Sequence, residues 1–343
     1  MGHSYHSPSW AAGGDVAAGS DAMADRGRVL VLAGGLCHER EVSLRSGRRV
    51  AEALRARGVE VEVRDVDALL LPALRADPPW VVFPVLHGAV GEDGAVREVL
   101  ESLGVPYVGA VPAAARLAFD KPTAKTLTGR VGLRSPRGVA LPHQLFRELG
   151  AQVLMDALVD QMGLPLMVKP TRGGSALGAS VVREPADLAT AMMGCFAYSE
   201  VALVEQYITG TEVAVAVVDV GDGPVALPPI EIVPDAGVYD YHARYTAGAT
   251  EFFVPQRRGP SVDEECRQVA LTAHRTLGLR DVSRTDLIVD AAGMTWFLEA
   301  NVAPGMTETS LLPMAAEAAG LDVGQLYLDL CRVAGSRRTT AAV

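Results

Sequence analysis

The sequence predicts an α/β protein with three domains. Its 343 residues are too many for one ordinary hydrophobic core and suit two or three α/β domains. Hydrophobic residues make up 49% of the chain and charged residues 21%, which is typical of a globular protein. Strand and helix patterns alternate in the first third of the chain, and the pattern then changes twice, near residues 111 and 205.

Residues 27–110 are predicted to form an N-terminal domain around a Rossmann-like parallel sheet. Strands are expected at 28–35, 59–66 and 80–86, and helical spacing of apolar residues covers 41–58. Strands that alternate with helices form parallel sheets through crossover connections. The segment has no GxGxxG sequence, which disfavours a nicotinamide-dependent dehydrogenase.

Residues 111–204 are predicted to form a second domain that carries a glycine-rich lid. The glycine-rich segment 171–178 lies between two expected strands, 166–169 and 179–182, so the three parts form a hairpin. Its residue order differs from the GxxxxGK[ST] of a P-loop, which disfavours a Walker-type ATPase. Glycines let backbone N–H groups approach phosphate oxygens, although such loops are more often plain turns.

Residues 205–334 are predicted to form a third domain that ends in a hairpin and two helices. A strand at 201–207 leads into it, another follows at 212–220, and a polar stretch covers 235–250. No internal repeat is evident, and the three blocks fit three separate domains.

The two ends of the chain are expected to lie outside these domains. Residues 1–26 are rich in Gly, Ala and Ser and are predicted to be a disordered tail, with Met23 as a candidate start. They contain no basic segment before an apolar core, so they do not resemble a signal peptide. Residues 335–343 are predicted to be a flexible tail.

Charge, hydropathy and cysteine usage exclude several classes of protein. The net charge of -10 argues against non-specific nucleic-acid binding, which requires a basic face. No apolar run reaches the roughly 18 residues of a membrane span. The four cysteines are far apart and form no CxxC pair, which is typical of a reduced cytoplasmic protein and not of a zinc site.

The most informative polar cluster lies on a predicted hairpin near the C-terminus. Strand patterns at 283–290 and 294–301 flank a turn at 290–293. If Asp290 pairs with Gly293, Asp286 faces Phe297 and Arg284 faces Glu299. Because side chains alternate along a strand, one face is then expected to carry Arg284, Asp286, Glu299 and Asn301, and the other Leu287, Val289, Leu298 and Ala300. Three oxygen ligands and an arginine suit Mg²⁺ and phosphate, although a solvated polar face would have the same pattern.

Lysine is rare enough in this chain to be informative. Of its 31 basic residues only Lys121, Lys125 and Lys169 are lysines. Lys169 ends the strand before the glycine-rich loop, where an ammonium group could contact phosphate. The loop and the later hairpin together fit Mg-ATP held between two sheets, the arrangement called ATP-grasp. The tight turn at 302–307 adds backbone N–H groups that could hold an oxyanion.

From about Arg28 to Val333 the chain resembles the D-alanine–D-alanine ligase family. Several motifs carry this resemblance in the expected order: 33–47 (AGGLCHEREVSLRSG), 86–94 (LHGAVGEDG), Asp120-Lys121, 169–178 (KPTRGGSALG), 239–245 (YDYHARY), 298–301 (LEAN), 304–307 (PGMT) and 310–313 (SLLP). Such a series implies a three-domain ATP-grasp architecture with an N-terminal pre-ATP-grasp domain.

The resemblance also implies a role for each matching residue. The ATP-binding residues would be Lys121, Lys169, Gly174, Ser175, Glu205, Gln206, Tyr207, Ile208, Glu212 and Arg244. The D-alanine substrates would contact Glu39, His87, Arg244, Tyr245, Ser310 and Leu311. Two Mg²⁺ ions, which Mn²⁺ could replace, would be bound by Asp286, Glu299 and Asn301. Catalysis would depend on Glu39, Ser175, Tyr245, Arg284 and the N–H of Gly305.

The implied reaction is the ATP-dependent joining of two D-alanines for peptidoglycan synthesis. ATP would phosphorylate the first D-alanine, and the amine of the second would displace phosphate. Tyr245, on a loop from about 234 to 249, would link with Ser175 and Glu39 to cover the site and exclude water. The implied enzyme is a cytoplasmic homodimer without nucleic-acid or membrane partners.

Four residues depart from the family pattern, at Arg97, Ala176, Arg244 and Val302, where Gln, Ser, Lys and Thr are usual. None of them removes an expected metal ligand. Arg244 bears on the choice of acceptor because a guanidinium is larger than an ammonium and forked. The alternatives are a ligase with D-lactate or D-serine as acceptor, an antibiotic-pathway dipeptide ligase, and a non-catalytic ATP-binding paralogue.

Overall fold

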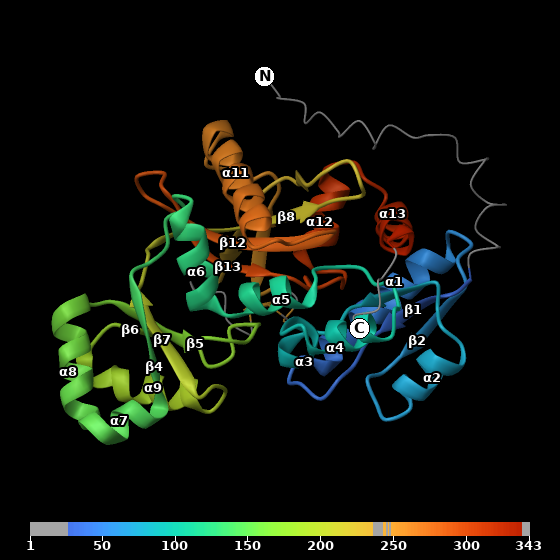
Figure 1. Ribbon diagram of the computed structural model, residues 1–343. Helices are drawn as coiled ribbons and strands as arrows, with labels where there is room; N and C mark the ends of the chain where they lie inside the picture. Colours follow the sequence, from blue (N-terminus) through green and yellow to red (C-terminus); the bar gives the residue numbers. More distant parts are fainter. Residues whose placement is uncertain (1–26, 236–242, 245, 247, 338–343) are drawn as a thin grey trace.

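Figure 1 shows the computed structural model, which describes residues 27–235, 243–244, 246 and 248–337. Within these residues the strands form three sheets, of three, four and six strands. The six-stranded sheet lies between the other two, with the four-stranded sheet (green) at one end and the parallel sheet (blue) at the other (Figure 1). None of the described helices is long and apolar enough to cross a membrane.

The N-terminal sheet is parallel, as the alternation of strands and helices predicts. Its strand order is β2-β1-β3, and β1 pairs in parallel with both neighbours. Val31 and Phe83 face α1 and α13, and Leu30 and Leu32 face α2 and α4. The elements are β1 (Val29–Leu32), α1 (Arg40–Arg55), β2 (Val61–Arg64), α2 (Leu70–Ala76), β3 (Val81–Pro84), α3 (Gly88–Glu92) and α4 (Ala95–Ser102).

The four-stranded sheet carries the glycine-rich loop. Its order is β4-β7-β5-β6, and β5 pairs antiparallel with β6 on either side of residues 171–179, which confirms the predicted hairpin. Helices cover one face of the sheet around Leu166 and Leu188. The elements are β4 (Gly138–Pro142), α7 (His143–Leu149), α8 (Ala151–Met162), β5 (Leu166–Pro170), β6 (Ser180–Val182), the 3₁₀ turn η2 (Pro185–Asp187), α9 (Leu188–Phe196) and β7 (Val201–Gln206).

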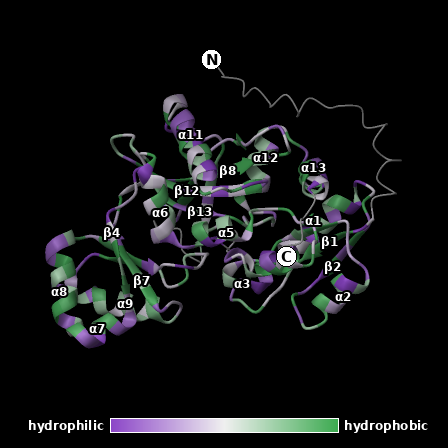
Figure 2. Ribbon diagram, viewed as in Figure 1, coloured by the Kyte–Doolittle hydropathy of each residue, from purple (hydrophilic) through white to green (hydrophobic). Residues whose placement is uncertain are grey.

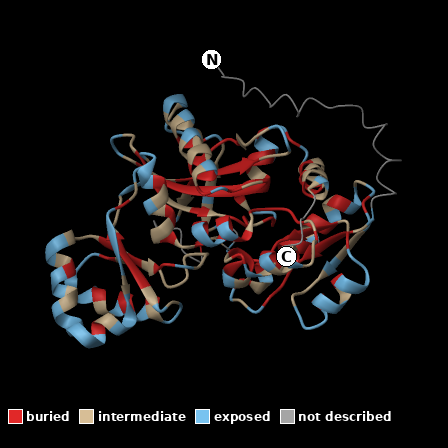
Figure 3. Cartoon of the chain, in the orientation of Figure 1, coloured by how far each residue is buried: buried red, intermediate tan, exposed pale blue. Residues whose placement is uncertain are grey.

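The six-stranded sheet is the central layer of the molecule. The order is β11-β10-β8-β12-β13, and the short β9 pairs with β8. Its central strands are buried (red in Figure 3), and β8 is hydrophobic along most of its length (green in Figure 2). The strands are β8 (Gly210–Val218), β9 (Val225–Ala226), β10 (Ile230–Pro234), β11 (Thr250–Phe253), β12 (Val282–Asp290) and β13 (Thr295–Asn301).

Helices from distant parts of the sequence cover this sheet. On one face α5 (Pro112–Phe119), α6 (Lys121–Arg130) and α11 (Pro260–Thr276) form a core around Ala115, Cys266 and Leu287. On the other face, α12 (Leu311–Ala318) and α13 (Val323–Ser336) join the sheet to the N-terminal domain, where α13 lies beside α1 (Figure 1). We therefore propose that α5 and α6 belong to the third domain, and that the boundary near residue 205 falls after β7.

The C-terminal hairpin forms as predicted, but with a different register. Arg284 lies opposite Asn301, Asp286 opposite Glu299, and Leu287 opposite Phe297. The predicted pairs were wrong because a β-bulge interrupts the ladder between Asp286 and Leu287, leaving Leu298 as an extra residue. The four polar residues still share one face. On the apolar side, Phe297 replaces Leu298 in the core, and Leu298 turns toward the large cavity described below.

Candidate active site

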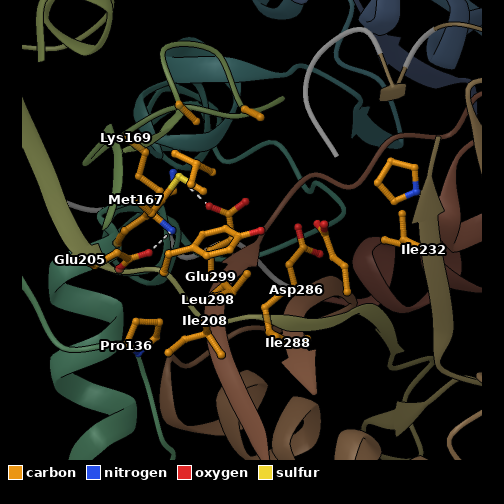
Figure 4. A pocket seen from close by; sticks show the side chains of 18 of the residues that line it. Pro136, Met167, Lys169, Glu205, Ile208, Ile232, Asp286, Ile288, Leu298 and Glu299 are labelled. Atoms are coloured by element: carbon orange, nitrogen blue, oxygen red, sulfur yellow. Dashed lines mark ion pairs between the residues drawn. The ribbon is translucent and has the colours of Figure 1, made fainter. Parts of the chain in front are cut away.

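A large cavity of about 670 Å³ lies between the four-stranded and six-stranded sheets. Figure 4 shows that its side chains converge from both sheets, with Met167, Lys169 and Glu205 on one side, Asp286 and Ile288 on the other, and Glu299 between them. The cavity is lined by every predicted ATP-binding residue except Ser175, and by two of the three predicted metal ligands. These are Lys121, Lys169, Gly174, Glu205, Gln206, Tyr207, Ile208, Glu212, Arg244, Asp286 and Glu299.

A second, small cavity of about 60 Å³ lies where the N-terminal domain meets the turn after β13. It is lined by Arg244 again and by the remaining predicted residues that the structure describes: Glu39, His87, Ser175, Arg284, Asn301, Gly305, Ser310 and Leu311. The tertiary structure thus brings together residues that are as far apart in sequence as Glu39 and Leu311. Tyr245 lies outside the described residues.

Two cation–carboxylate pairs occupy the polar face of the C-terminal hairpin. Arg284 donates to both oxygens of Asp286, from Nε at 2.6 Å and from Nη2 at 2.8 Å. Lys121 Nζ lies 3.0 Å from Glu299 Oε2 and donates to the carbonyl of Gly173 at 2.7 Å. Burial by itself would raise the pKa of Glu299, but Lys121 and Lys169 outweigh it and lower that pKa to about 2. Glu299 is therefore fully ionised at neutral pH.

The donor set on this face fits a hard divalent cation that also binds a nucleotide. Asp286 and Glu299 are direct cross-strand partners, and Asn301 adds an amide oxygen two residue pairs further along, on the same face. Among the described residues there is no cluster of three Asp, Glu, His or Cys side chains that could hold a metal alone. Mg²⁺ is commonly bound by one or two carboxylates together with substrate phosphates, and two carboxylates beside a nucleotide-sized cavity match this pattern.

Glu205 is held by two lysines that come from different elements. Its carboxylate pairs with Lys169 Nζ at 2.5 Å and also with Lys125 Nζ. Burial opposes ionisation of Glu205, but the two ammonium groups outweigh it and lower its pKa. The family resemblance implied that Lys169 and Glu205 bind ATP, and it gave Lys125 no role. All three rare lysines therefore lie at or directly behind the large cavity.

Arg244 lines both cavities, so it lies at their junction. Its Nη2 is 3.9 Å from Glu212 Oε1, and its side chain is only 15% exposed. Burial raises the pKa of Glu212 to about 7, although Arg244 acts in the opposite direction. The replacement of the usual lysine by Arg244 therefore lies at the junction of the two predicted subsites.

The glycine-rich loop contacts the N-terminal domain through Glu39. Ser175 Oγ donates a hydrogen bond to Glu39 Oε1. A Cβ at Gly174 would lie 2.9 Å from the same oxygen, so glycine at this position allows the close approach. Ser175 and Ala176 both have left-handed backbone conformations, with φ of 53° and 55°. The loop thus adopts a tight shape that carries Ser175 over the small cavity.

His87 is a neutral hydrogen-bond acceptor in the small cavity. Burial lowers its pKa to about 4, and its Nδ1–H donates to the carbonyl of Ala303 at 3.1 Å. Its Nε2 therefore carries the lone pair, and this atom is buried without a partner among the described residues. An unprotonated imidazole nitrogen near the Glu39 carboxylate suits a substrate ammonium group.

The turn after β13 presents a backbone donor at Gly305. The N–H of Met306 donates to Ser46 Oγ at 3.1 Å, and the N–H of Thr307 donates to Ser310 Oγ at 2.9 Å. A Cβ at Gly305 would lie 2.7 Å from Ser310 Oγ, which explains why glycine is needed here. Gly305 and Arg284 both line the small cavity, as expected if the Gly305 N–H and the guanidinium are the predicted oxyanion donors.

Sequence reasoning did not single out Glu92, which also lines the small cavity. Burial first, and then the nearby charge of Glu39, raise the pKa of Glu92 to about 8. Its Oε1 accepts a hydrogen bond from the Gly88 N–H at 2.9 Å. The sequence feature that could have marked Glu92 as a site residue is its position in the 86–94 motif. The charges that surround Glu92 in the cavity could not be predicted from the sequence, because they come from distant segments.

Of the other three departures from the family pattern, Arg97 and Val302 line neither cavity, and Ala176 lines the large one. Arg97 is 2% exposed on α4 and donates to the carbonyl of Gly91. Val302 is 1% exposed and belongs to the core beneath the six-stranded sheet. Ala176 lines the large cavity, where it adds no hydroxyl.

Replacing Glu92 by glutamine should stabilise the protein relative to the unchanged chain, and this stability difference should be larger at alkaline pH than at acidic pH. The folded-state pKa of Glu92 is raised from an ordinary value of 4.5 to about 8, and Glu39, Glu299 and Lys121 are the charges that surround it. Unfolding therefore releases a proton between these two pH values, so stability falls as pH rises through this window. Glutamine has no proton to release and keeps an acceptor for Gly88.

The measurement is the melting temperature of both proteins from pH 5 to pH 9. We expect the difference to grow by several degrees between pH 5 and pH 8. A difference that is constant with pH would show that Glu92 is ionised in the folded protein.

Known proteins match this chain over most of its length. The model for the D-ala D-ala ligase C-terminus matches residues 128–332, and the N-terminus model matches residues 63–110. A D-alanine--D-alanine ligase from Nitrosospira multiformis is 41% identical over 312 residues, covering 90% of this chain and 97% of that protein.

Solved structures of ligases with related names also resemble this chain. A D-Ala:D-Ser ligase from Enterococcus faecalis has a TM-score of 0.75 and 26% identity, covering 90% of this chain and 99% of that one. A D-alanine--D-alanine ligase from Bacillus anthracis complexed with ATP has a TM-score of 0.73 and 26% identity, covering 92% and 99%. This chain belongs to the D-alanine–D-alanine ligase family of ATP-dependent enzymes.

Proposed function

We propose that this protein joins two D-alanine molecules to D-alanyl-D-alanine, with conversion of ATP to ADP and phosphate, for peptidoglycan precursors. The observation that carries the proposal is the pair of adjoining cavities that share Arg244. One has the size and lysines for a nucleotide, and the other has charged and polar groups that suit the ammonium and carboxylate of an amino acid. Relatives about 40% identical that are named D-alanine--D-alanine ligase support the same conclusion.

In the first step the chain positions a carboxylate against the terminal phosphate of ATP. Glu39 and the free Nε2 of His87 would hold the ammonium of the first D-alanine, so its carboxylate points toward Arg244. Lys121 and Lys169, which both line the large cavity, would offset the negative charge of the phosphates. A carboxylate oxygen attacks the γ-phosphorus, and ADP leaves, giving D-alanyl phosphate.

In the second step the amine of the other D-alanine attacks the acyl carbon. The tetrahedral intermediate carries a negative oxygen, which the guanidinium of Arg284 and the N–H of Gly305 would stabilise. Inorganic phosphate then leaves with the C–O electron pair, and the amine loses a proton. Ser310 and Leu311, at the start of α12, would contact the acceptor.

The acyl phosphate must be kept from water. The Ser175–Glu39 hydrogen bond fastens the glycine-rich loop to the N-terminal domain over the small cavity. Such closure is the general means by which enzymes protect a hydrolysable intermediate.

Two Mg²⁺ ions are part of this proposal, with Asp286, Glu299 and Asn301 as the protein ligands. When bound, Mg²⁺ would supply positive charge to the phosphate oxygens during transfer. A homodimer, cytoplasmic location and a covering role for Tyr245 stay predictions from the family resemblance.

Release of ADP and phosphate with Mg-ATP and D-alanine alone is the direct test, with the product identified by mass. We expect D-alanyl-D-alanine as the main product. If phosphate is released only when D-lactate or D-serine is added, the acceptor assignment is wrong and the ATP chemistry is retained. No nucleotide turnover under any of these conditions would contradict the proposed function itself.

Acceptor choice is expected to depend on Arg244, since it alone among the departures lines both cavities. The matched variant is Arg244→Lys, which restores the usual ammonium. A shift in product ratio between D-alanine and D-serine in this variant, with ATP consumption retained, would place Arg244 beside the acceptor.

A further inference from the structure

Lys125 is the one rare lysine that the proposed reaction does not use. It lies one helical turn after Lys121 on α6, so the two side chains leave the same face of the helix. Lys121 reaches Glu299 on the six-stranded sheet, and Lys125 reaches Glu205 on the four-stranded sheet. Helix α6 therefore supplies one cation to each of the two sheets that enclose the large cavity.

The two lysines that hold Glu205 differ in access to the cavity. Lys169 lines it, so the phosphates of a nucleotide can attract its ammonium group away from Glu205. Lys125 does not line it and lies behind Glu205, with its side chain 10% exposed. When Lys169 turns to phosphate, Lys125 remains as a counterion for the Glu205 carboxylate, which is only 2% exposed.

Glu205 is also fixed by the backbone around it. It lies opposite Gly138 on β4 and Met167 on β5, in the interior of the sheet. A Cβ at Gly138 would lie 2.8 Å from the Cβ of Glu205, so this residue has no room for a larger neighbour. Apolar side chains, including Met167, Ile208 and Leu298, line the adjoining part of the cavity, as expected for a site that holds a flat base (Figure 4).

The charge of Glu205 decides which base it can accept. An ionised carboxylate only accepts hydrogen bonds, so it suits the 6-amino group of adenine and repels the 6-oxygen of guanine. A protonated carboxyl group can also donate a hydrogen bond, so it would no longer distinguish adenine from guanine. A carboxylate this deeply buried stays ionised only with a cation beside it.

We propose that Lys125 is a positioning residue that acts as the permanent counterion of Glu205 and thereby sets the preference of this enzyme for adenine nucleotides. This inference rests on the proposed function, because it takes the large cavity to be the ATP site. Lys125 then affects the selectivity for the base, which a purely structural lysine would not do.

The test uses Lys125→Met, which keeps the length of the side chain and removes its charge. The measured quantity is kcat/KM with ATP and with purine riboside triphosphate, which lacks the 6-amino group, at saturating D-alanine. A hydrogen bond to a charged acceptor predicts that the unchanged enzyme prefers ATP about tenfold or more. We expect Lys125→Met to lose most of this preference, through a higher KM for ATP, and Lys125→Arg to keep it.

Full retention of the ATP preference in Lys125→Met would overturn the proposal, even if total activity fell. If that variant does not fold, Glu205→Gln is compared with the Glu205→Gln/Lys125→Met double variant, which buries no unpaired carboxylate. The single and double variants should show the same preference for ATP over purine riboside triphosphate. A difference in this preference would mean that Lys125 acts independently of Glu205 and would overturn the proposal. Absence of any ATP turnover in the unchanged protein would instead contradict the proposed function.

Discussion

Replacing Glu299 by glutamine should slow ADP formation by about 10³-fold or more, without unfolding the protein. Glu299 carries a full negative charge, because Lys121 and Lys169 hold its pKa at about 2, and it lies directly opposite Asp286. Glutamine has nearly the same shape but no charge, so it would weaken the binding of a divalent cation and leave Lys121 without its carboxylate partner. The measurement is the rate of ADP release as a function of Mg²⁺ concentration.

The matched control is Glu251→Gln, which removes an exposed carboxylate from β11 of the same sheet. It should leave the rate unchanged. Melting temperatures of both variants show whether the fold is retained. Full activity of the Glu299 variant at ordinary Mg²⁺ concentration would reject Glu299 as a metal ligand.

Replacing Arg284 by lysine should lower kcat by about 10²–10³-fold and change the KM for ATP little. Arg284 lines the small cavity and not the adjoining one proposed for the nucleotide, and its guanidinium is held in place by two hydrogen bonds to Asp286. Lysine keeps the positive charge beside Asp286 but cannot form the same fork, so its charge no longer lies where the oxyanion develops. A group that acts mainly in the transition state affects kcat more than substrate binding.

The control for this variant is Arg267→Lys, which changes another arginine that pairs with an aspartate, Asp263, outside both cavities. It should retain normal kinetics. Equal losses in kcat and in ATP affinity for the Arg284 variant would place this arginine in the nucleotide site instead.

Most elements that carry the site could be predicted from the sequence. Apolar periodicity is a local property, so it indicated the parallel strands near Val31 and Phe83, the hairpin around the glycine-rich loop, and the polar face that carries Asp286 and Glu299. The residue pattern also indicated the tight turn at 302–307, and the family resemblance added a role for Gly305 within it. These are features for which a short segment contains all the relevant information.

The bulge at Leu298 was not predictable in the same way. The period-two rule places Leu298 in the core and Phe297 on the polar face, and the structure reverses both positions. One extra residue in a strand changes the face of every residue beyond it, and no local pattern marks where the extra residue is accommodated.

The sequence by itself determined the fold class, the nucleotide-binding character and the ionisable groups that this protein has available. The tertiary structure alone decided which of those groups meet: Lys125 and Lys169 on one carboxylate, Arg244 between two cavities, and Glu92 beside Glu39. The physical reason is that strand and helix patterns depend on neighbours along the chain. Charge pairing depends on how α6, β5 and β7 pack, and the pKa of a buried group depends on every charge that this packing brings near it.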